Sequence, residues 1–189
     1  MPNKNFILAS GSPRRQQFFK TLGIPFTILV KEVDEIYPTH LKAQEITNFL
    51  AQLKADAFTN LNDNDVVITS DTIVWHNKQA LGKPKDKNDA FAMLQSLANN
   101  THEVITSVCF KTNSKTEIIY DITSVTFGNL TSEMIQYYIT NYNPLDKAGA
   151  YGIQEWIGEV GIEKIEGSYT NVVGLPVAKV YEYINKNFL

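Results

Sequence analysis

A strand, a turn and the start of a helix follow one another directly within the first fifteen residues. Residues 6–9 form a short apolar run that predicts a strand, and Ser10 and Gly11 then turn the chain. Ser12 and Pro13 have the form of a helix start, with Ser12 as N-cap and Pro13 at the first helical position. A strand that passes into a helix this directly favours a fold that combines both elements.

Apolar spacing alternates between strand-like and helix-like periods along the rest of the chain, which is typical of an α/β or α+β domain. Helical periods cover residues 13–22, 43–61, 87–97, 131–142 and a segment from about residue 177. Strand-like runs cover residues 6–9, 26–30, 65–70, 73–75, 101–112 and 115–127. Residues 33–42 predict a loop, and residues 149–174 are rich in glycine. Without repeats or linkers, we expect a single domain over residues 1–189.

The composition is that of a globular protein. The chain has 189 residues, of which 43% are hydrophobic and 20% charged, so it is long enough to bury a core. Its formal net charge is −3, and this balance favours neither nucleic acid nor an anionic membrane as a partner. Any polyphosphate site must therefore be a local basic cluster within a mildly acidic protein.

Cys109 is the only cysteine, which excludes an intrachain disulfide and a cysteine-based zinc site. It lies within the apolar residues 104–110, and we expect it to be a small buried hydrophobe. The N-terminal segment has no signal-peptide core, and no apolar run is long enough to cross a bilayer. We therefore expect a cytoplasmic protein.

Arg14 and Arg15 fall in the first turn of the helix that begins at Pro13. This end of a helix favours negative charge, because its unpaired N–H groups and the helix dipole are both positive. Two arginines beside free amides and the hydroxyls of Ser10 and Ser12 suit a bound anion, above all a phosphate chain. The alternative is a surface helix whose arginines are solvated.

Asp71 is the strongest candidate for a catalytic carboxylate. It closes the apolar strand at residues 65–70, and open α/β sheets place functional side chains at strand ends. Thr72 adds a hydroxyl beside it, and Glu35 adds a second acidic group from the loop at residues 33–42. Two carboxylates near a polyphosphate can hold Mg²⁺ or activate water. Alternatively, Asp71 caps a turn.

Two lysines are candidates for contacts with phosphate. Lys83 lies between Gly82, which permits close backbone approach, and Pro84, which stiffens the loop. Lys54 falls just beside the apolar stripe of the helix at residues 43–61. Each lysine could instead be a solvent-facing side chain.

The segment at residues 146–154 suits close approach of a backbone to a ligand, because two glycines flank a tyrosine after an acid–base pair. Gln154 carries a donor and an acceptor, as needed to recognise the edge of a base. Residues 167–176 form a second glycine-containing loop. The chain has neither a P-loop nor a G-x-S-x-G elbow, which disfavours kinase-type and esterase-type chemistry.

Taken together, these segments resemble the Maf family of nucleoside triphosphate pyrophosphatases. The matching blocks occur in family order at residues 8–15, 70–74, 81–84, 146–154 and 167–176. The form of residues 150–154, Ala-Tyr-Gly-Ile-Gln, is similar to the branch that acts on dTTP and UTP. The resemblance implies an α/β fold with a mixed twisted sheet, flanking helices and two lobes around a central cleft, as in inosine triphosphatase-like proteins.

The resemblance also implies hydrolysis of a nucleoside triphosphate between its α- and β-phosphates, giving the monophosphate and pyrophosphate. Asp71 then matches the position of the proton acceptor. Glu35 and Asp71 match the acidic positions near the metal ion, and the implied cofactor is Mg²⁺ or Mn²⁺. Specificity and phosphate contacts are implied for two sets of residues: Arg14, Thr72 and Gln154 for substrate choice, and Ser10, Ser12, Arg15, Lys54 and Lys83 for phosphate.

One departure from the family pattern is visible. After Gln154 the family commonly has glycine, whereas Glu155 and Trp156 follow here, next to the expected base pocket. The preferred nucleotide is therefore dTTP, UTP or a modified pyrimidine nucleotide. The family resemblance is compatible with a homodimer. An alternative function is a nucleotide-binding regulator of cell division with secondary hydrolysis, and a third is a noncatalytic interaction domain.

Overall fold

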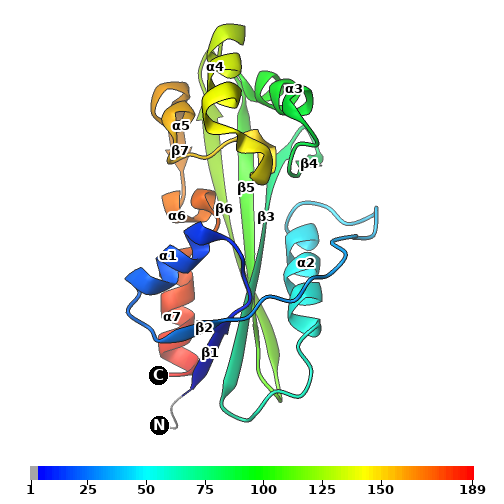
Figure 1. Cartoon of the computed structure of the whole chain (residues 1–189), viewed down its shortest axis with the longest axis vertical. Coiled ribbons are helices and arrows are strands. Elements are labelled where there is room, and N and C mark those ends of the chain that lie inside the picture. The colour runs from blue at the N-terminus through cyan, green and yellow to red at the C-terminus, as the bar shows by residue number, and fades with distance from the viewer. Residues whose placement is uncertain (1–3) are drawn as a thin grey trace. The chain divides into compact units, whose positions relative to one another are not determined.

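The computed structural model describes residues 4–189 and divides into two compact units (Figure 1). The first unit comprises the described part of Met1–Asp71 together with Thr106–Asp121 and Gly174–Leu189. The second unit comprises Thr72–Ile105 and Ile122–Val173. The expectations of a single domain and of a central cleft both depend on how these units are placed, and they stay predictions.

Parallel strands form the centre of the first unit. Strand β1 (Asn5–Leu8) lies between β2 (Phe26–Ile28) and the first half of β3 (Asp65–His76), and it pairs with both in parallel. Helices α1 (Pro13–Thr21) and α7 (Val177–Asn187) lie on one side of these strands in Figure 1, and α2 (Gln44–Asp56) lies on the other.

The first unit buries apolar side chains from the helices against the strands. Phe19 of α1 and Ile184 of α7 are fully buried together with Leu8 and Ile68 of the strands. On the side of α2, Cys109 is buried as expected, and burial raises the pKa of its thiol to about 12. The thiol therefore stays protonated and packs as a small hydrophobe.

The second unit combines antiparallel strands with helices. The second half of β3 pairs with β4 (Gln79–Leu81) through a turn at Asn77 and Lys78. Both turn residues have positive φ, which is the geometry of a two-residue hairpin turn. Strand β6 (Thr116–Phe127) pairs antiparallel with β7 (Ile162–Glu166).

Helices α3 (Lys87–Leu97) and α4 (Ser132–Tyr142) supply much of the core of the second unit. Tyr138 of α4 is fully buried there. The remaining elements of this unit are short, namely η1 (Pro144–Asp146), η2 (Ala148–Ala150), α5 (Trp156–Gly161) and α6 (Tyr169–Val173). Elements η2, α5 and α6, together with β7, fall within or at the start of the glycine-rich residues 149–174, where the sequence predicts no regular element.

Hydrogen bonds connect the strands in the order β2-β1-β3-β5-β6-β7, where β5 is Thr101–Lys111, and β4 pairs with β3 outside this path. The sheet contains parallel and antiparallel pairs and carries helices, so the predicted α/β class with a mixed sheet is confirmed. Helix α2 is shorter than the predicted 43–61. It ends at Asp56, because the carbonyl of Ala57 accepts a hydrogen bond from Lys31 and Asn60 adopts a positive φ.

His102 lies in the core of the second unit, where its Nε2 atom is 2.7 Å from the hydroxyl of Tyr151. Burial, with a smaller effect of His76, lowers the pKa of His102 to about 3. The folded protein therefore keeps this imidazole neutral, whereas the unfolded chain binds a proton below about pH 6.5.

We predict that this difference lowers the stability of the protein in acid. The free energy of unfolding should fall by about 1.4 kcal/mol per pH unit between pH 6.5 and 3, because only the unfolded state takes up the proton. His102→Gln should reduce this slope, as measured by urea unfolding at successive pH values. His40→Gln, at an exposed position, is the matched control. Identical slopes for wild type and His102→Gln would contradict the prediction.

Candidate functional site

Asp71 lies inside strand β3 and does not close it. The strand continues through the β-branched residues Thr72, Ile73 and Val74 and gains a partner strand at Leu81, so the sequence-based boundary was wrong. Asp71 is buried, with a relative exposure of 6% for the residue as a whole. Burial raises the pKa of its carboxyl group, and the positive charge of Lys54 opposes this shift. The buried position within β3 therefore restricts the Asp71 carboxylate to one location.

Lys54 connects the two candidate carboxylates. Its Nζ atom lies 2.7 Å from Oδ1 of Asp71 and 3.1 Å from Oε2 of Glu35. The lysine side chain is 16% exposed, so the alternative of a solvent-facing helix residue is wrong. Lys54 comes from the last turn of α2 and Glu35 from the predicted loop. One ammonium group therefore compensates two carboxylates that would otherwise repel each other.

Arg15 is anchored by main-chain carbonyl groups. Its Nε atom donates to the carbonyl of Gly174 at 2.8 Å, and Nη1 donates to the carbonyl of Ser70 at 3.0 Å. Burial lowers its pKa, and the carboxylate of Asp71 acts in the opposite direction. The guanidinium group therefore ties the first turn of α1 to β3, beside Asp71. Arg14 is half-buried, and its charge also lowers the pKa of Arg15.

The two serines occupy the turn between β1 and α1. Ser12 stands at the N-cap position as predicted, but its side chain does not cap the helix. Its backbone N–H donates to Oγ of the buried Ser10 at 3.3 Å, and the side chain of Gln16 donates to the Ser10 carbonyl. The first unit thus brings together seven predicted site residues on β1–α1, α2, β3 and one loop: Ser10, Ser12, Arg14, Arg15, Glu35, Lys54 and Asp71.

The second unit carries the other three predicted residues, Thr72, Lys83 and Gln154. Thr72 is half-buried, and Lys83 and Gln154 are exposed. The backbone N–H of Gly149 donates to the carbonyl of Gly82 at 3.0 Å, which joins the Lys83 loop to the segment that leads to Gln154. Gly149 has a φ of 68°, and a Cβ there would lie 2.7 Å from Val74, so this close approach requires glycine.

The surroundings of Gln154 were not predicted from the sequence. Lys147 is buried, and its Nζ atom lies 3.1 Å from Oε1 of Glu155 and 2.7 Å from Oδ1 of Asp146. Oε2 of Glu155 accepts a hydrogen bond from the hydroxyl of Tyr138. The acid–base pair at residues 146–147 was a visible signal in the sequence, whereas Tyr138 looks like an ordinary core residue of its helix.

The chemistry of the donor set fits a divalent cation. Glu35 and Asp71 supply carboxylate oxygens, and both already approach one cationic atom, Lys54 Nζ. Within residues 4–189 no group of three or more His, Cys, Asp or Glu side chains is placed to hold a metal ion. Mg²⁺ is often bound by only one or two carboxylates, with water and phosphate oxygens completing its shell.

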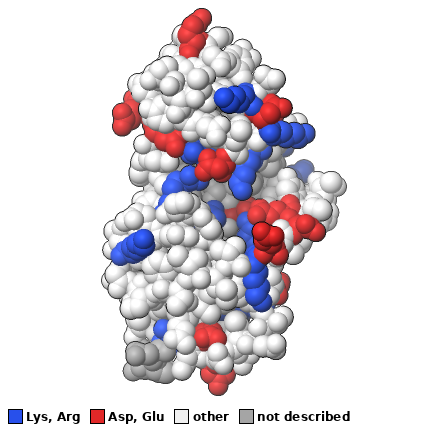
Figure 2. All heavy atoms as spheres, viewed as in Figure 1, with Lys and Arg blue, Asp and Glu red and all other residues white. Residues whose placement is uncertain are grey.

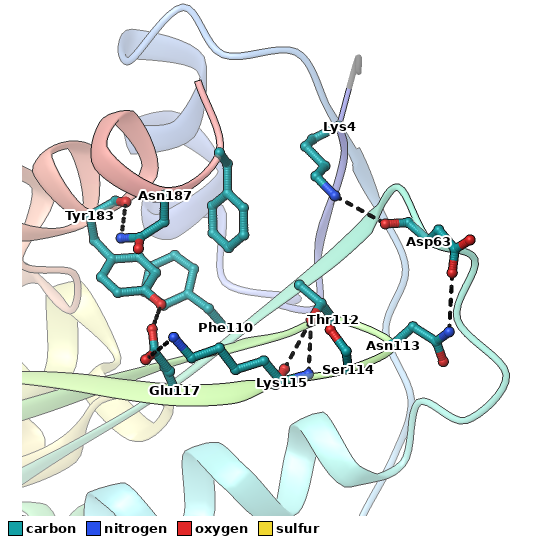
Figure 3. Close-up of a pocket in the computed structure, with 11 residues that line it drawn as sticks. Lys4, Asp63, Phe110, Thr112, Asn113, Ser114, Lys115, Glu117, Tyr183 and Asn187 are labelled. Atoms are coloured by element: carbon teal, nitrogen blue, oxygen red, sulfur yellow. Dashed lines mark hydrogen bonds and ion pairs between the residues drawn. The ribbon is translucent and has the colours of Figure 1, made fainter. Parts of the chain in front are cut away.

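A pocket of about 450 Å³ lies elsewhere in the first unit (Figure 3). Phe110 and Tyr183 stack within it, with ring centroids 4.3 Å apart. Its charged groups pair with nearby groups, since Lys4 donates to the carbonyl of Asp63 and Glu117 contacts both Lys115 and Tyr183. None of the predicted site residues lines this pocket, so it is not the candidate site.

Charges of both signs lie close together on the face shown in Figure 2, as expected for a chain with a net charge of −3. No helix within residues 4–189 has the length and hydropathy needed to cross a membrane.

Comparisons with known proteins find similarity over nearly the whole chain. The family described as Maf-like protein matches residues 5–187. A protein of Flavobacterium johnsoniae named dTTP/UTP pyrophosphatase is 65% identical over 179 residues, which cover 94% of this chain and 92% of that protein. A protein of the same name from Bacteroides fragilis is 45% identical over 95% of this chain and 94% of its own length.

A solved structure of the Staphylococcus aureus Ham1 protein is similar with a TM-score of 0.54. The match covers 97% of this chain and 99% of that chain at 14% identity. At this identity the likeness shows the fold alone, and it agrees with the mixed α/β sheet described above.

We predict that Arg15→Lys destabilises the protein by about 1–3 kcal/mol, because an ammonium group cannot replace the fork of donors that reaches two carbonyl groups. Urea unfolding would measure the loss. Arg14→Lys changes the same residue type at the neighbouring position and should cost less. Equal unfolding midpoints for the two variants would show that the contacts of Arg15 with Ser70 and Gly174 do not hold α1 in place.

Proposed function

Because this chain belongs to the Maf family, we propose that it is a pyrophosphatase that converts dTTP and UTP to the monophosphate and pyrophosphate. The name shared by the relatives from Flavobacterium and Bacteroides supports this substrate class. The observation that carries the proposal is the buried Asp71 carboxylate, held by Lys54 beside Glu35 and Arg15. A pure binding module would not need a buried carboxylate among groups that bind phosphate.

Asp71 acts in this proposal as the base that takes a proton from the attacking water. Burial raises its pKa and so makes the carboxylate a stronger base, while Lys54 keeps it ionised. The attack on the α-phosphorus breaks the bond to the β-phosphate and releases pyrophosphate. Glu35 and Asp71 would hold the divalent cation, Mg²⁺ or Mn²⁺, which when bound neutralises phosphate charge.

The basic residues offset the negative charge that builds on the leaving pyrophosphate. We assign this role to Arg14, Arg15 and Lys83, with the hydroxyls of Ser10 and Ser12 as further donors to phosphate. Thr72 and Gln154, together with Arg14, are assigned to substrate choice. The homodimer and the cytoplasmic location expected from the sequence stay predictions.

We predict that the protein releases pyrophosphate from dTTP or UTP in the presence of Mg²⁺ or Mn²⁺, and that Asp71→Asn lowers kcat by about 100-fold or more. A panel of dTTP, UTP, CTP and modified pyrimidine triphosphates would be assayed for pyrophosphate and orthophosphate. Asp63→Asn, at an exposed aspartate, is the matched control. Release of orthophosphate would reject cleavage between the α- and β-phosphates. Tight binding without release would favour the nucleotide-binding regulator.

We predict that Lys54→Met lowers kcat by about 100-fold, because Asp71 and Glu35 then lack the cation between them. Lys54→Arg keeps the charge and should recover part of the rate. Lys111→Met is the control. Lys111 pairs with Asp56 of α2, the helix that also carries Lys54, and this pair lies at a more exposed position. Steady-state kinetics would measure all three, and a full rate for Lys54→Met would contradict the assigned role.

A further inference from the structure

Gln154 stands on a turn whose two ends are joined. The backbone N–H of Glu155 donates to the carbonyl of Gly152 at 3.0 Å, and Gln154 is exposed between these ends. Because this hydrogen bond closes the turn, the orientation of the turn sets the direction in which the Gln154 side chain leaves the backbone. The groups that hold Gly152 and Glu155 therefore decide where the Gln154 amide can be presented.

One buried hydroxyl binds both ends of this turn. The hydroxyl of Tyr138 accepts a hydrogen bond from the backbone N–H of Gly152 at 2.9 Å and donates one to Oε2 of Glu155. Tyr138 is fully buried in α4, and burial together with Glu155 raises the pKa of its hydroxyl, which keeps it protonated as a donor. The turn is thus attached to the core of the second unit.

Lys147 completes the attachment from the other side. Its Nζ atom lies 3.1 Å from Oε1 of Glu155, so both carboxylate oxygens of Glu155 have a partner. The Lys147 side chain is 8% exposed, and such a charge is retained only when it is paired. Glu155 therefore has one well-defined position, although its side chain is itself 19% exposed.

The amide of Gln154 and this carboxylate both flank the α-carbon of Gly152. A Cβ built on Gly152 would be 2.9 Å from Nε2 of Gln154, 2.9 Å from Cδ of Glu155 and 3.0 Å from Cε of Lys147. The three side chains thus converge on Gly152, and a Cβ there would require their ends to shift. A carboxylate at this point attracts the N–H end of the amide and repels its oxygen, which favours one of the two amide orientations.

Amide orientation matters because an amide can pair with opposite base edges. Uracil and thymine present an acceptor at O4 and a donor at N3, whereas cytosine presents a donor at N4 and an acceptor at N3. A freely rotating amide matches both patterns and selects neither. An amide with a fixed orientation rejects the base whose donors and acceptors are reversed.

We propose that Glu155, held by Lys147 and Tyr138, is a positioning residue that fixes the Gln154 amide and thereby selects uracil and thymine over cytosine. The proposal rests on the proposed function only in taking Gln154 as the residue that contacts the base. It gives the acidic residue after Gln154 a defined role, whereas the sequence shows only a departure from the family pattern.

The test is equilibrium binding of UTP and of CTP by calorimetry, with EDTA present so that no turnover occurs. Wild type should bind UTP at least about tenfold more tightly than CTP. Glu155→Ala should lose this ratio through weaker binding of UTP, and Glu155→Gln should keep part of it because one contact to Lys147 or Tyr138 survives. Glu159→Gln, at an exposed glutamate of α5, is the matched control and should retain the wild-type ratio.

A purely structural role of Glu155 predicts a different result. It would weaken UTP and CTP binding equally and lower the unfolding midpoint, which a thermal melt of each variant detects. Such a result, or equal affinities of wild type for the two nucleotides, would overturn the proposal. Should Glu155→Ala not fold, the same ratio is measured with Glu155→Gln and Tyr138→Phe, and an unchanged ratio in both would overturn it.

The two proposals fail separately. If wild type binds UTP in preference to CTP and Glu155→Ala loses the preference, the positioning role stands even where no pyrophosphate is released. If pyrophosphate is released but the binding ratio does not respond to Glu155, the proposed function stands and the positioning role fails. In the active enzyme, loss of positioning should raise KM for UTP by about tenfold and leave kcat within about threefold.

Discussion

The ammonium group of Lys54 is the interaction on which the candidate catalytic centre depends. Asp71 is buried inside a strand, and an isolated carboxylate at such a place would take up a proton and no longer accept one from water. Contact with Lys54 at 2.7 Å keeps the charge, and Glu35 shares the same cation at 3.1 Å. Helix α2 and strand β3 must therefore pack in one register for the centre to exist.

The second unit repeats this arrangement for a different purpose. Lys147 lies between Asp146 and Glu155 as Lys54 lies between Asp71 and Glu35. The difference is the hydroxyl of Tyr138, which binds Glu155 and the turn backbone together. We propose that the lysine of the first unit holds a group that reacts, whereas the lysine of the second unit holds a group that orients its neighbour.

Sequence patterns predict those elements whose signals are local. Helix α3 has the predicted bounds because Asp86 caps it with two side-chain hydrogen bonds. The end of β3 was misplaced because its extension depends on pairing with β4, a nonlocal contact. The pairing of Lys54 with Asp71 joins residues seventeen positions apart, and helical periodicity alone favoured solvent exposure.

Tyr138 shows why selectivity is hard to predict from motifs. Its spacing in α4 is that of a core residue, and its ring does pack in the core of the second unit. Its hydroxyl nevertheless controls a turn that no motif connects to α4, because hydrogen bonds to Gly152 and Glu155 form only after the chain has folded. In the proposed positioning role Tyr138 binds no substrate and would still affect which substrate fits, since the turn it holds carries Gln154, the residue proposed to contact the base. Sequence motifs therefore identify candidate contacts with substrate more readily than the buried groups that hold those candidates in place.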